Sequence, residues 1–162
     1  MKILHVNYSE LIGGAAIGAN RLHKALLKLN INSEMLVVEK STNEKNVHGP
    51  KTSLEELISK SKKILSRFIK KKFMKTSNKE TFSFNYFNSN FLNKINLINP
   101  DVVHIHWIGN EMISISQLKK IKKPIIWTFW DMWPFCGAEH YTNNKRYQNG
   151  YNKNNKDCEG LD

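Results

Sequence analysis

The opening of the chain decides its fold class: residues 2–30 read "KILHVNYSELIGGAAIGANRLHKALLKLN". Residues 2–7 form a short run rich in aliphatic side chains, which predicts a buried strand. Two glycines follow, and apolar residues then recur at helical spacing over residues 15–29, which predicts an amphipathic helix. A strand joined to a helix by a short glycine-containing turn is typical of an α/β domain.

The same alternation continues along the chain. We expect further strands at 34–39, 102–107 and 124–129, and helices at 54–75, 88–98 and 114–122. Residues 40–53 are polar and contain Gly49-Pro50, which predicts a loop, and residues 81–87 alternate like a strand or an extended segment. Strands that alternate with helices predict a parallel sheet with helices on both faces. The sequence therefore predicts a Rossmann-like α/β domain over residues 1–141.

Residues 142–162 differ in kind from the rest of the chain. They are polar, rich in Asn and Lys, and have no apolar periodicity. The chain stops there without a further strand or helix, which is unusual for an open α/β sheet. We therefore expect the chain to be truncated before the rest of its domain.

The composition limits the classes of function. The chain has 162 residues, and its 40% of hydrophobic residues suits one domain, or part of one, rather than a disordered chain. The formal net charge of +11 indicates an acidic partner: nucleic acid, an anionic membrane surface or a phosphorylated small molecule. No apolar run approaches the roughly 20 residues of a membrane span, and the start of the chain lacks the pattern of a secretion signal.

The two cysteines, Cys136 and Cys158, lie far apart without a CxxC pairing. A cytosolic chain keeps such residues as thiols. The expected location is the cytoplasm, with peripheral contact at the inner face of the membrane as an option.

Gly13 and Gly14 lie between the first strand and the first helix, at the edge where ligands collect in doubly wound sheets. A glycine lets the backbone approach a ligand closely, and a helix N-terminus favours a phosphate. The spacing is not GxGxxG, so it does not predict a dinucleotide site. The alternative is a tight turn that needs positive φ.

The stretch "DVVHIHWIGN" carries His104 and His106, which strand alternation places on one face. Two histidines could share a metal ion, but no third ligand has convincing spacing, so we expect no metal. One of them is then a hydrogen-bonded core residue. Because His106 lies nearest the carboxyl end of the strand, it is the one expected to face a cleft.

The stretch "WTFWDMWPF" follows the last expected strand. Its tryptophans offer flat apolar faces that stack on sugar rings, although three of them would also hold a loop down by packing alone. Asp131 could cap a helical turn or accept hydrogen bonds from a sugar or a base. We expect Trp127 and Phe129 to lie nearer the core and Asp131 nearer the ligand.

Together, "IIWTFWDMWPFCGAEHY", "DVVHIHWIG" and the early "GGAA" resemble the amino-terminal half of the family-4 glycosyltransferases that build bacterial cell-surface polysaccharides, such as lipopolysaccharide or capsule. The resemblance covers most of the chain and is weakest across residues 40–90. It implies a GT-B architecture, in which two Rossmann-like domains face each other across a cleft. It also implies a retaining hexosyl transfer from a nucleotide-sugar to a saccharide or lipid-linked saccharide acceptor, without a metal ion or other cofactor.

The resemblance implies roles for particular residues. Gly13 and Gly14 match the glycine-rich loop that approaches the donor diphosphate, and His106 and Trp107 match the "HxHW" end of a strand. Where many relatives have a histidine at the reaction centre, this chain has Trp130, which cannot exchange protons. The residues expected to bind substrate are Gly13, Gly14, His106, Trp107, Trp130, Asp131 and His140, and Asp131 is the catalytic candidate.

The carboxylates that contact the donor in this family belong to a carboxyl-terminal domain that this chain lacks. The resemblance thus implies that this chain holds only the acceptor half of the active site and is inactive alone.

Residues 54–75 predict a helix with one apolar face and eight Lys or Arg from Lys60 to Lys75. Such a helix suits an anionic membrane or a diphosphate lipid, although a charged face over an ordinary core contact is the commoner case. Three interpretations stay open: a glycosyltransferase acceptor domain, a non-catalytic module that binds a sugar or a lipid-linked acceptor, and a nucleic-acid-binding protein. The last is the weakest, because no nucleic-acid-binding motif appears and the basic run has no interleaved aromatics, so we expect no nucleic acid partner.

Overall fold

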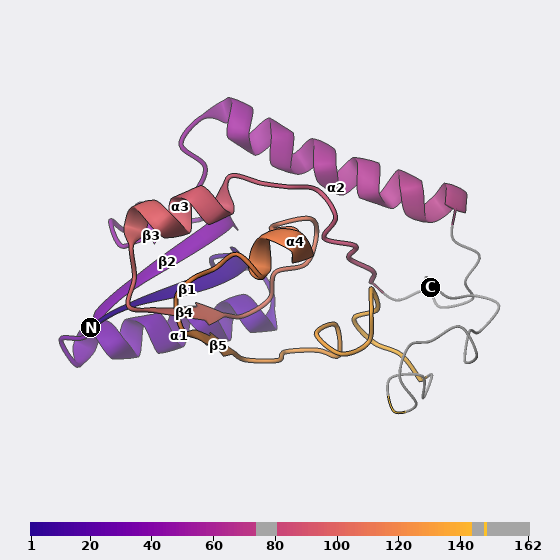
Figure 1. The fold of residues 1–162 in the computed structure, drawn as a ribbon. Coiled ribbons are helices and arrows are strands. Elements are labelled where there is room, and N and C mark those ends of the chain that lie inside the picture. The colour runs from indigo at the N-terminus through magenta and orange to yellow at the C-terminus, as the bar shows by residue number, and fades with distance from the viewer. Residues whose placement is uncertain (74–80, 144–147, 149–162) are drawn as a thin grey trace.

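The computed structural model describes residues 1–73, 81–143 and 148. Its elements follow in the order β1 (Lys2–Ser9), α1 (Gly14–Lys28), β2 (Asn32–Glu39), β3 (Val47–His48), α2 (Ser53–Phe73), α3 (Phe91–Ile98), β4 (Val102–Ile105), α4 (Ile115–Leu118) and β5 (Ile125–Trp127). The five strands form one parallel sheet in the order β3-β2-β1-β4-β5 (Figure 1). The prediction of a Rossmann-like α/β fold is confirmed.

The sheet has a switch point between its two central strands. From β1 the chain crosses through α1 to β2 and β3 on one side, and later returns to β4 and β5 on the other side. The loops that leave β1 and β4 therefore diverge in opposite directions and open a crevice at the carboxyl edge of the sheet.

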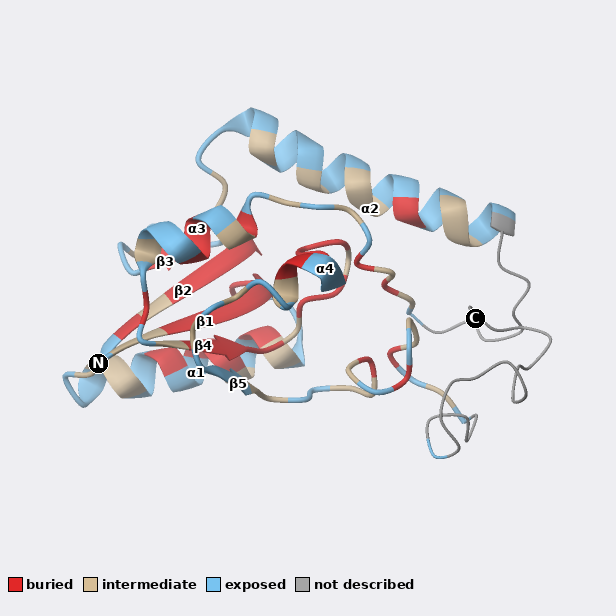
Figure 2. Ribbon diagram, in the orientation of Figure 1, coloured by how far each residue is buried: buried red, intermediate tan, exposed pale blue. Residues whose placement is uncertain are grey.

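One face of the sheet carries the larger apolar core. Leu4, Leu36 and Ile105 point to this face and pack with Phe91 and Ile95 of α3. The short helix α4 and the turn before it complete this layer, and Figure 2 shows most of β1, β2 and β4 and the inner side of α3 as buried.

Helix α1 covers the other face of the sheet over β1 and β2. Its buried side consists of small or polar residues, including Ala16 and Ala19, which let the helix lie close to Met35 and Val37 of β2. With α3 and α4 on the first face, helices flank the sheet on both faces, as the sequence predicts.

Helix α2 lies outside these layers and touches the rest of the chain through polar contacts. Glu55 forms an ion pair with Lys94 of α3 at 2.7 Å, and the Ser66 hydroxyl donates to Glu111 at 3.0 Å. The Lys62 ammonium donates to the carbonyl of Asn88. Most of the helix surface is exposed (Figure 2). No helix in the described part of the chain is long and apolar enough to cross a membrane.

The structure corrects several local predictions. The expected loop at 40–53 contains the two-residue strand β3, which sequence periodicity cannot detect because it is too short. Residues 81–87 form an extended segment with a single antiparallel bridge, Phe82 to Glu139, and no regular strand. Phe129, expected nearer the core, is 55% exposed because β5 ends two residues earlier and the chain leaves the sheet. Most of the predicted polar tail lies outside the described residues.

Candidate functional site

A cleft of about 540 Å³ opens at the switch point of the sheet. Its walls come from the end of β1, the start of α1, the end of β4 and the loop after β5. Six of the seven residues expected to bind substrate line this one cleft: Gly13, Gly14, Trp107, Trp130, Asp131 and His140. Residues separated by more than a hundred positions meet there because the carboxyl ends of parallel strands share one edge.

The glycine-rich loop brings backbone close to the cleft. Gly13 has φ +94° and ψ 161°, a backbone conformation that glycine adopts without strain, and it is the N-cap of α1. The Gly13 carbonyl accepts the first helical hydrogen bond from the N–H of Ile17. No side chain of the described residues caps this helix start, and its first turn holds no acidic residue. The free N–H groups and the helix dipole therefore favour an anion at this end of the cleft.

Asp131 is the most strongly held polar group of the site. Its Oδ2 accepts hydrogen bonds from Nε1 of Trp107 at 2.7 Å and from Nδ1 of His140 at 2.5 Å. Its Oδ1 accepts the backbone N–H of Trp133 at 3.0 Å. The carboxylate is thus fixed in one orientation, with lone-pair capacity left on Oδ1 for a ligand.

The surroundings of Asp131 keep it ionised. Burial alone would raise the pKa of this carboxyl, but the hydrogen bond and charge interaction with His140 outweigh burial, with help from the N–H groups of Trp133 and Trp107. The pKa of Asp131 therefore lies below its ordinary value. A carboxylate of this kind accepts hydrogen bonds well but is a weak proton acceptor near neutral pH.

Ser83, His140 and Asp131 form a chain that resembles a hydrolytic triad. Nε2 of His140 lies 2.7 Å from the Ser83 hydroxyl, and Nδ1 of His140 contacts Asp131. Ser83, however, is only 1% exposed, and its Oγ also accepts the backbone N–H of Asn110 at 2.9 Å. A nucleophile must reach its substrate, so this chain fixes the cleft wall and does not attack a substrate.

The structure contradicts the prediction that His106 faces the cleft. His106 is 3% exposed and does not line the cleft, because the indole of Trp130 lies between them. Nε1 of Trp130 donates to Nδ1 of His106 at 3.2 Å. The prediction that His106 lies near the carboxyl edge of the sheet is correct. Its side chain, however, points to the face of the sheet that α1 covers and not into the cleft.

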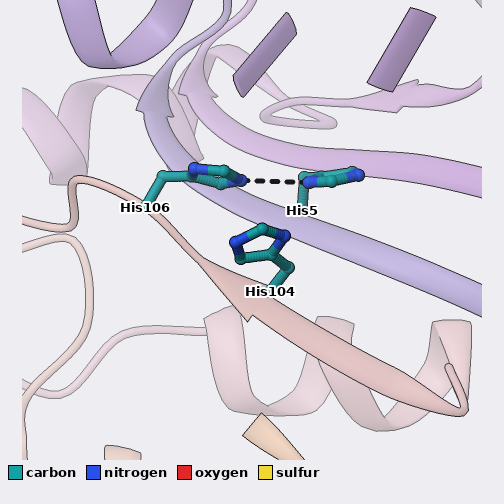
Figure 3. Close-up of side chains that lie close together, drawn as sticks. All are labelled: His5, His104 and His106. Carbon is teal, nitrogen blue, oxygen red and sulfur yellow. Dashed lines mark hydrogen bonds between the residues drawn. The ribbon is translucent and has the colours of Figure 1, made fainter. Parts of the chain in front are cut away.

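His106 belongs to a cluster of three buried histidines that includes a residue sequence reasoning missed. Register pairs His5 of β1 with His104 of β4, and Nδ1 of His5 lies 3.0 Å from Nε2 of His106 (Figure 3). His104 stacks against His106 and contacts the Thr128 hydroxyl through Nε2 at 2.8 Å. The sequence did hold one signal for His5. It lies between Leu4 and Val6 in the first strand, so alternation places it on the opposite face of the sheet from these two core residues.

The hydrogen bonds fix the tautomers of this cluster. An indole N–H only donates, so Nδ1 of His106 accepts and the His106 proton sits on Nε2, which donates to Nδ1 of His5. The remaining N–H of His5 is buried and has no partner among the described residues. Burial, reinforced by His104, lowers the pKa of both His5 and His106 to about 3, so these rings are neutral.

Three neutral histidines are a possible metal ligand set, and one nitrogen from each lies within 4.8 Å of the others. A metal ion must lie in the plane of each ring that binds it. His104 and His106 are instead stacked, with centroids 4.2 Å apart and planes 30° apart. An ion would require these rings to turn and His106 to give up the Nε2 proton. In the described geometry the cluster is a hydrogen-bonded stack that supports Trp130.

The sequence did not point to several other residues that line the cleft, among them Tyr8, Lys63 and Asn110. Tyr8 is the residue before the last of β1, so its place at the carboxyl edge could have been inferred. Burial, together with the charge of Glu39 and a hydrogen bond to it, raises the pKa of Tyr8 to about 12. Lys63 reaches the cleft from α2, and its ammonium lies 5.1 Å from the centre of the Tyr8 ring. This position could not be predicted from the sequence, because it depends on how α2 packs.

Comparison of the chain with protein-family models, with curated proteins and with solved structures finds no match.

Proposed function

We propose that the chain is the acceptor-side domain of a retaining GT-B glycosyltransferase, which moves a sugar from a nucleotide-sugar to a polysaccharide or lipid-linked oligosaccharide. The observation that carries this proposal is the cleft at the switch point, where six residues singled out by the motifs meet. A fold of this kind hosts many functions, so the argument depends on the site and not on the sheet.

The cleft suits a saccharide. Trp107 and Trp130 present aromatic surface to it, and Trp130 is 40% exposed. Aromatic faces stack on the apolar face of a sugar ring, and a fixed carboxylate such as Asp131 accepts hydrogen bonds from sugar hydroxyls. The Gly13–Gly14 loop and the α1 N-terminus offer a place for the donor diphosphate. The part of this chain in the reaction is then to bind and orient, while a second domain supplies the groups that contact the donor.

A binding screen on immobilised oligosaccharides tests the acceptor site. Wild-type chain is expected to retain a subset of saccharides, and Trp130→Ala is expected to lose them, since one stacked aromatic is worth about 1 kcal/mol or more. Phe129→Ala is the matched control, because Phe129 is an exposed aromatic of the same loop that does not line the cleft. Equal losses for the two variants, or no retained saccharide, would contradict the proposal.

A transfer assay tests the half-site. We expect no sugar transfer by this chain alone from any nucleotide-sugar in a panel. The size of the native polypeptide in its source cells, by immunoblot and intact mass, shows whether a second domain is present. If it is, the longer chain should transfer sugar, and turnover by the present chain alone would refute the half-site.

The outer face of α2 supports peripheral contact with a membrane at the cytoplasmic side. Six of its apolar residues are exposed: Leu54, Leu57, Ile58, Ile64, Leu65 and Phe68. The commoner alternative, an apolar face buried in the core, is wrong for this helix. Exposed lysines flank the stripe at Lys60, Lys71 and Lys72. An apolar stripe beside cations suits the surface of an anionic bilayer.

Co-sedimentation with phosphatidylglycerol vesicles tests this contact. The variant Leu57→Ser/Ile64→Ser/Phe68→Ser is expected to bind the vesicles at least about tenfold more weakly, because each apolar side chain contributes on the order of 1 kcal/mol to insertion. Leu29→Ser/Leu97→Ser/Ile115→Ser replaces three equally exposed apolar residues elsewhere and serves as the control. Equal binding by both variants would rule out docking through α2.

A further inference from the structure

A second hollow lies beside the cleft, at the carboxyl end of β2, and has a volume of about 540 Å³. The two hollows share Tyr8 and Glu39 and therefore meet at these residues. The other walls of the second hollow come from the loop after β2 and from the first turns of α2. They include the polar side chains of Ser41, Thr42, Asn43, Thr52, Ser53 and Glu56, so this hollow is named the polar pocket.

The loop wall of the polar pocket is held in place by a network of hydrogen bonds. The carboxylate of Glu10, which is fully buried, accepts the backbone N–H groups of Ser41 and Thr42 at 2.7 and 2.9 Å. It also accepts the Thr42 hydroxyl at 2.5 Å, and the Lys40 ammonium donates to the carbonyl of Val47 at 2.6 Å. The wall is thus formed without a ligand, and a ligand that binds there does not have to order the loop.

The charges of the polar pocket largely balance, which favours a neutral ligand over an anion. Its lysines are Lys40, Lys51 and Lys60, and its carboxylates are those of Glu39 and Glu56. Lys60 and Glu56 form an ion pair at 2.6 Å. The start of α2 lies at this pocket, but the two acidic side chains in its first turn offset the positive end of the helix dipole. What remains for a ligand is a set of groups that donate and accept hydrogen bonds.

Tyr8 connects the polar pocket to the aromatic wall of the cleft. Its ring contacts Trp107 edge to face, with centroids 5.7 Å apart, and its hydroxyl bonds to the carboxylate of Glu39. A carboxylate has roughly four sites that accept hydrogen bonds, so Glu39 keeps capacity for a ligand after it has bonded to Tyr8. The side chains of Ser41 and Asn43 bond to no other described residue. A ligand that stacks on Trp107 and extends past Tyr8 therefore meets polar groups that can still bind it.

We propose that the polar pocket binds the second sugar ring of a neutral saccharide whose first ring lies in the cleft. This inference rests on the proposed function and adds that the acceptor has at least two sugars. The first ring stacks on Trp107 and Trp130. The second ring lies beyond the Tyr8 ring, where its hydroxyls bond to Ser41 and Asn43. Hydroxyl groups both donate and accept hydrogen bonds, which matches these side chains, and the pocket falls within the roughly 300–1,000 Å³ of small-ligand sites.

NMR titration of the full chain with pairs of saccharides tests the polar pocket. Each pair compares a methyl glycoside with a disaccharide of the same sugar: methyl glucoside with maltose, methyl mannoside with mannobiose, and methyl N-acetylglucosaminide with chitobiose. For at least one pair, we expect the wild type to bind the disaccharide at least about tenfold more tightly, because the second ring adds hydrogen bonds to the pocket.

The variant Asn43→Leu/Ser53→Leu places an aliphatic side chain on each of the two walls of the pocket and removes their hydrogen bonds to the second ring. We expect it to bind the disaccharide and the methyl glycoside with affinities within about threefold of each other. The matched control is Asn46→Leu/Ser61→Leu, which makes the same substitutions at exposed positions of the same loop and helix, outside both hollows. This control should keep the preference for the disaccharide.

The outcomes separate the second subsite from the proposed function. Loss of the disaccharide preference in the pocket variant alone supports the subsite. Equal affinities of the wild type for the two members of every pair, or equal losses in both double variants, would overturn it. If the methyl glycosides bind as tightly as the disaccharides and Trp130→Ala abolishes both, the subsite is refuted while the proposed function stands. If no saccharide of either length binds, both fail.

Circular dichroism and thermal unfolding establish that the variants fold. Should the double variant in the pocket fail to fold, Ser53→Leu against Ser61→Leu gives the same comparison on α2 alone. Both serines are exposed, so neither substitution disturbs the core.

Discussion

The two faces of the central sheet are built in opposite ways. The face under α3 and α4 is an aliphatic core in which Leu4, Leu36 and Ile105 interlock with α3. The face under α1 carries a polar layer at its centre, made of His5, His23, His104 and His106. The strands β1 and β4 contribute to both layers by alternating their side chains, while β2 adds Leu36 to the first layer and α1 adds His23 to the second.

The two faces are stabilised by different kinds of interaction. Apolar contacts have no preferred direction, so the aliphatic face depends only on side chains that fill its volume. The histidine face depends on hydrogen bonds in sequence, from Trp130 to His106 to His5, and two of its nitrogens, Nε2 of His5 and Nε2 of His23, have no partner among the described residues. Buried polar groups of this kind are costly when a partner is lost. The cleft wall at Trp130 rests on this second face.

Acid should produce the largest effect, and between pH 7 and pH 5 it should act mainly through the histidine face. The pKa of His5 and that of His106 are about 3 in the folded chain, against about 6.5 in an unfolded chain. The unfolded state thus binds more protons between these values. Stability is therefore complete above about pH 6.5 and falls as the pH drops toward 3, by at most about 1.4 kcal/mol per pH unit for each histidine.

Urea unfolding measured from pH 7 to pH 5, above the range of most carboxyl groups, checks this expectation. His106→Gln removes one of the two groups and should flatten the pH dependence, whatever it does to the stability itself. If the unfolding free energy depends on pH with the same slope in the wild type and in the variant, protonation of His106 is not linked to unfolding.

Truncation on the aliphatic face should come next in size. Ile105→Ala is expected to lower the free energy of unfolding by about 2–5 kcal/mol, because the fully buried side chain leaves a cavity. Ile126→Ala, on the neighbouring strand but 54% exposed, should change it by less than about 0.5 kcal/mol. Urea unfolding at pH 7 measures both, and similar losses would mean that the aliphatic face is not the main core.

Removal of the indole hydrogen bond should have a smaller effect. Trp130→Phe keeps an aromatic ring over the histidine layer but leaves Nδ1 of His106 without its donor. We expect a loss of about 1–2 kcal/mol in unfolding free energy. NMR of the histidine ring nitrogens should show the proton of His106 redistribute between its two nitrogens. An unchanged ring spectrum would show that the tautomer is not fixed by Trp130.

The smallest effect should come from a methyl group on α1. A Cβ at Gly18 would lie 2.2 Å from Cη2 of Trp130, so Gly18→Ala must push the exposed end of the indole away. The better helix propensity of alanine, worth about 1 kcal/mol, offsets part of this cost, so the stability should change little. The Trp130 indole N–H resonance should nevertheless shift. Gly14→Ala, whose Cβ meets nothing within 4 Å, is the control and should leave that resonance in place.

Much of the fold follows from local patterns. The aliphatic runs gave four of the five strands, and the helical spacing gave α1, α2 and α3 to within a few residues, because alternation and the 3.6-residue repeat are encoded locally. The glycine loop and Asp131 were correctly expected at the carboxyl edge, since that edge follows from strand direction. The strand β3 and the burial of His106 could not be predicted, because each depends on what packs against the strand.

The sequence by itself determined which residues share a face of each element, and so the α/β class, the edge that carries the cleft and the motif residues that line it. Only the tertiary structure decided what covers each face. Register between β1 and β4 brought His5 to His104 and His106, although about a hundred residues separate them. Packing also turned α2 so that Glu55, Lys62 and Ser66 contact the rest of the chain and most of its apolar residues are exposed. Periodicity is a property of one segment, whereas burial is a property of two segments in contact, and only the folded chain brings them together.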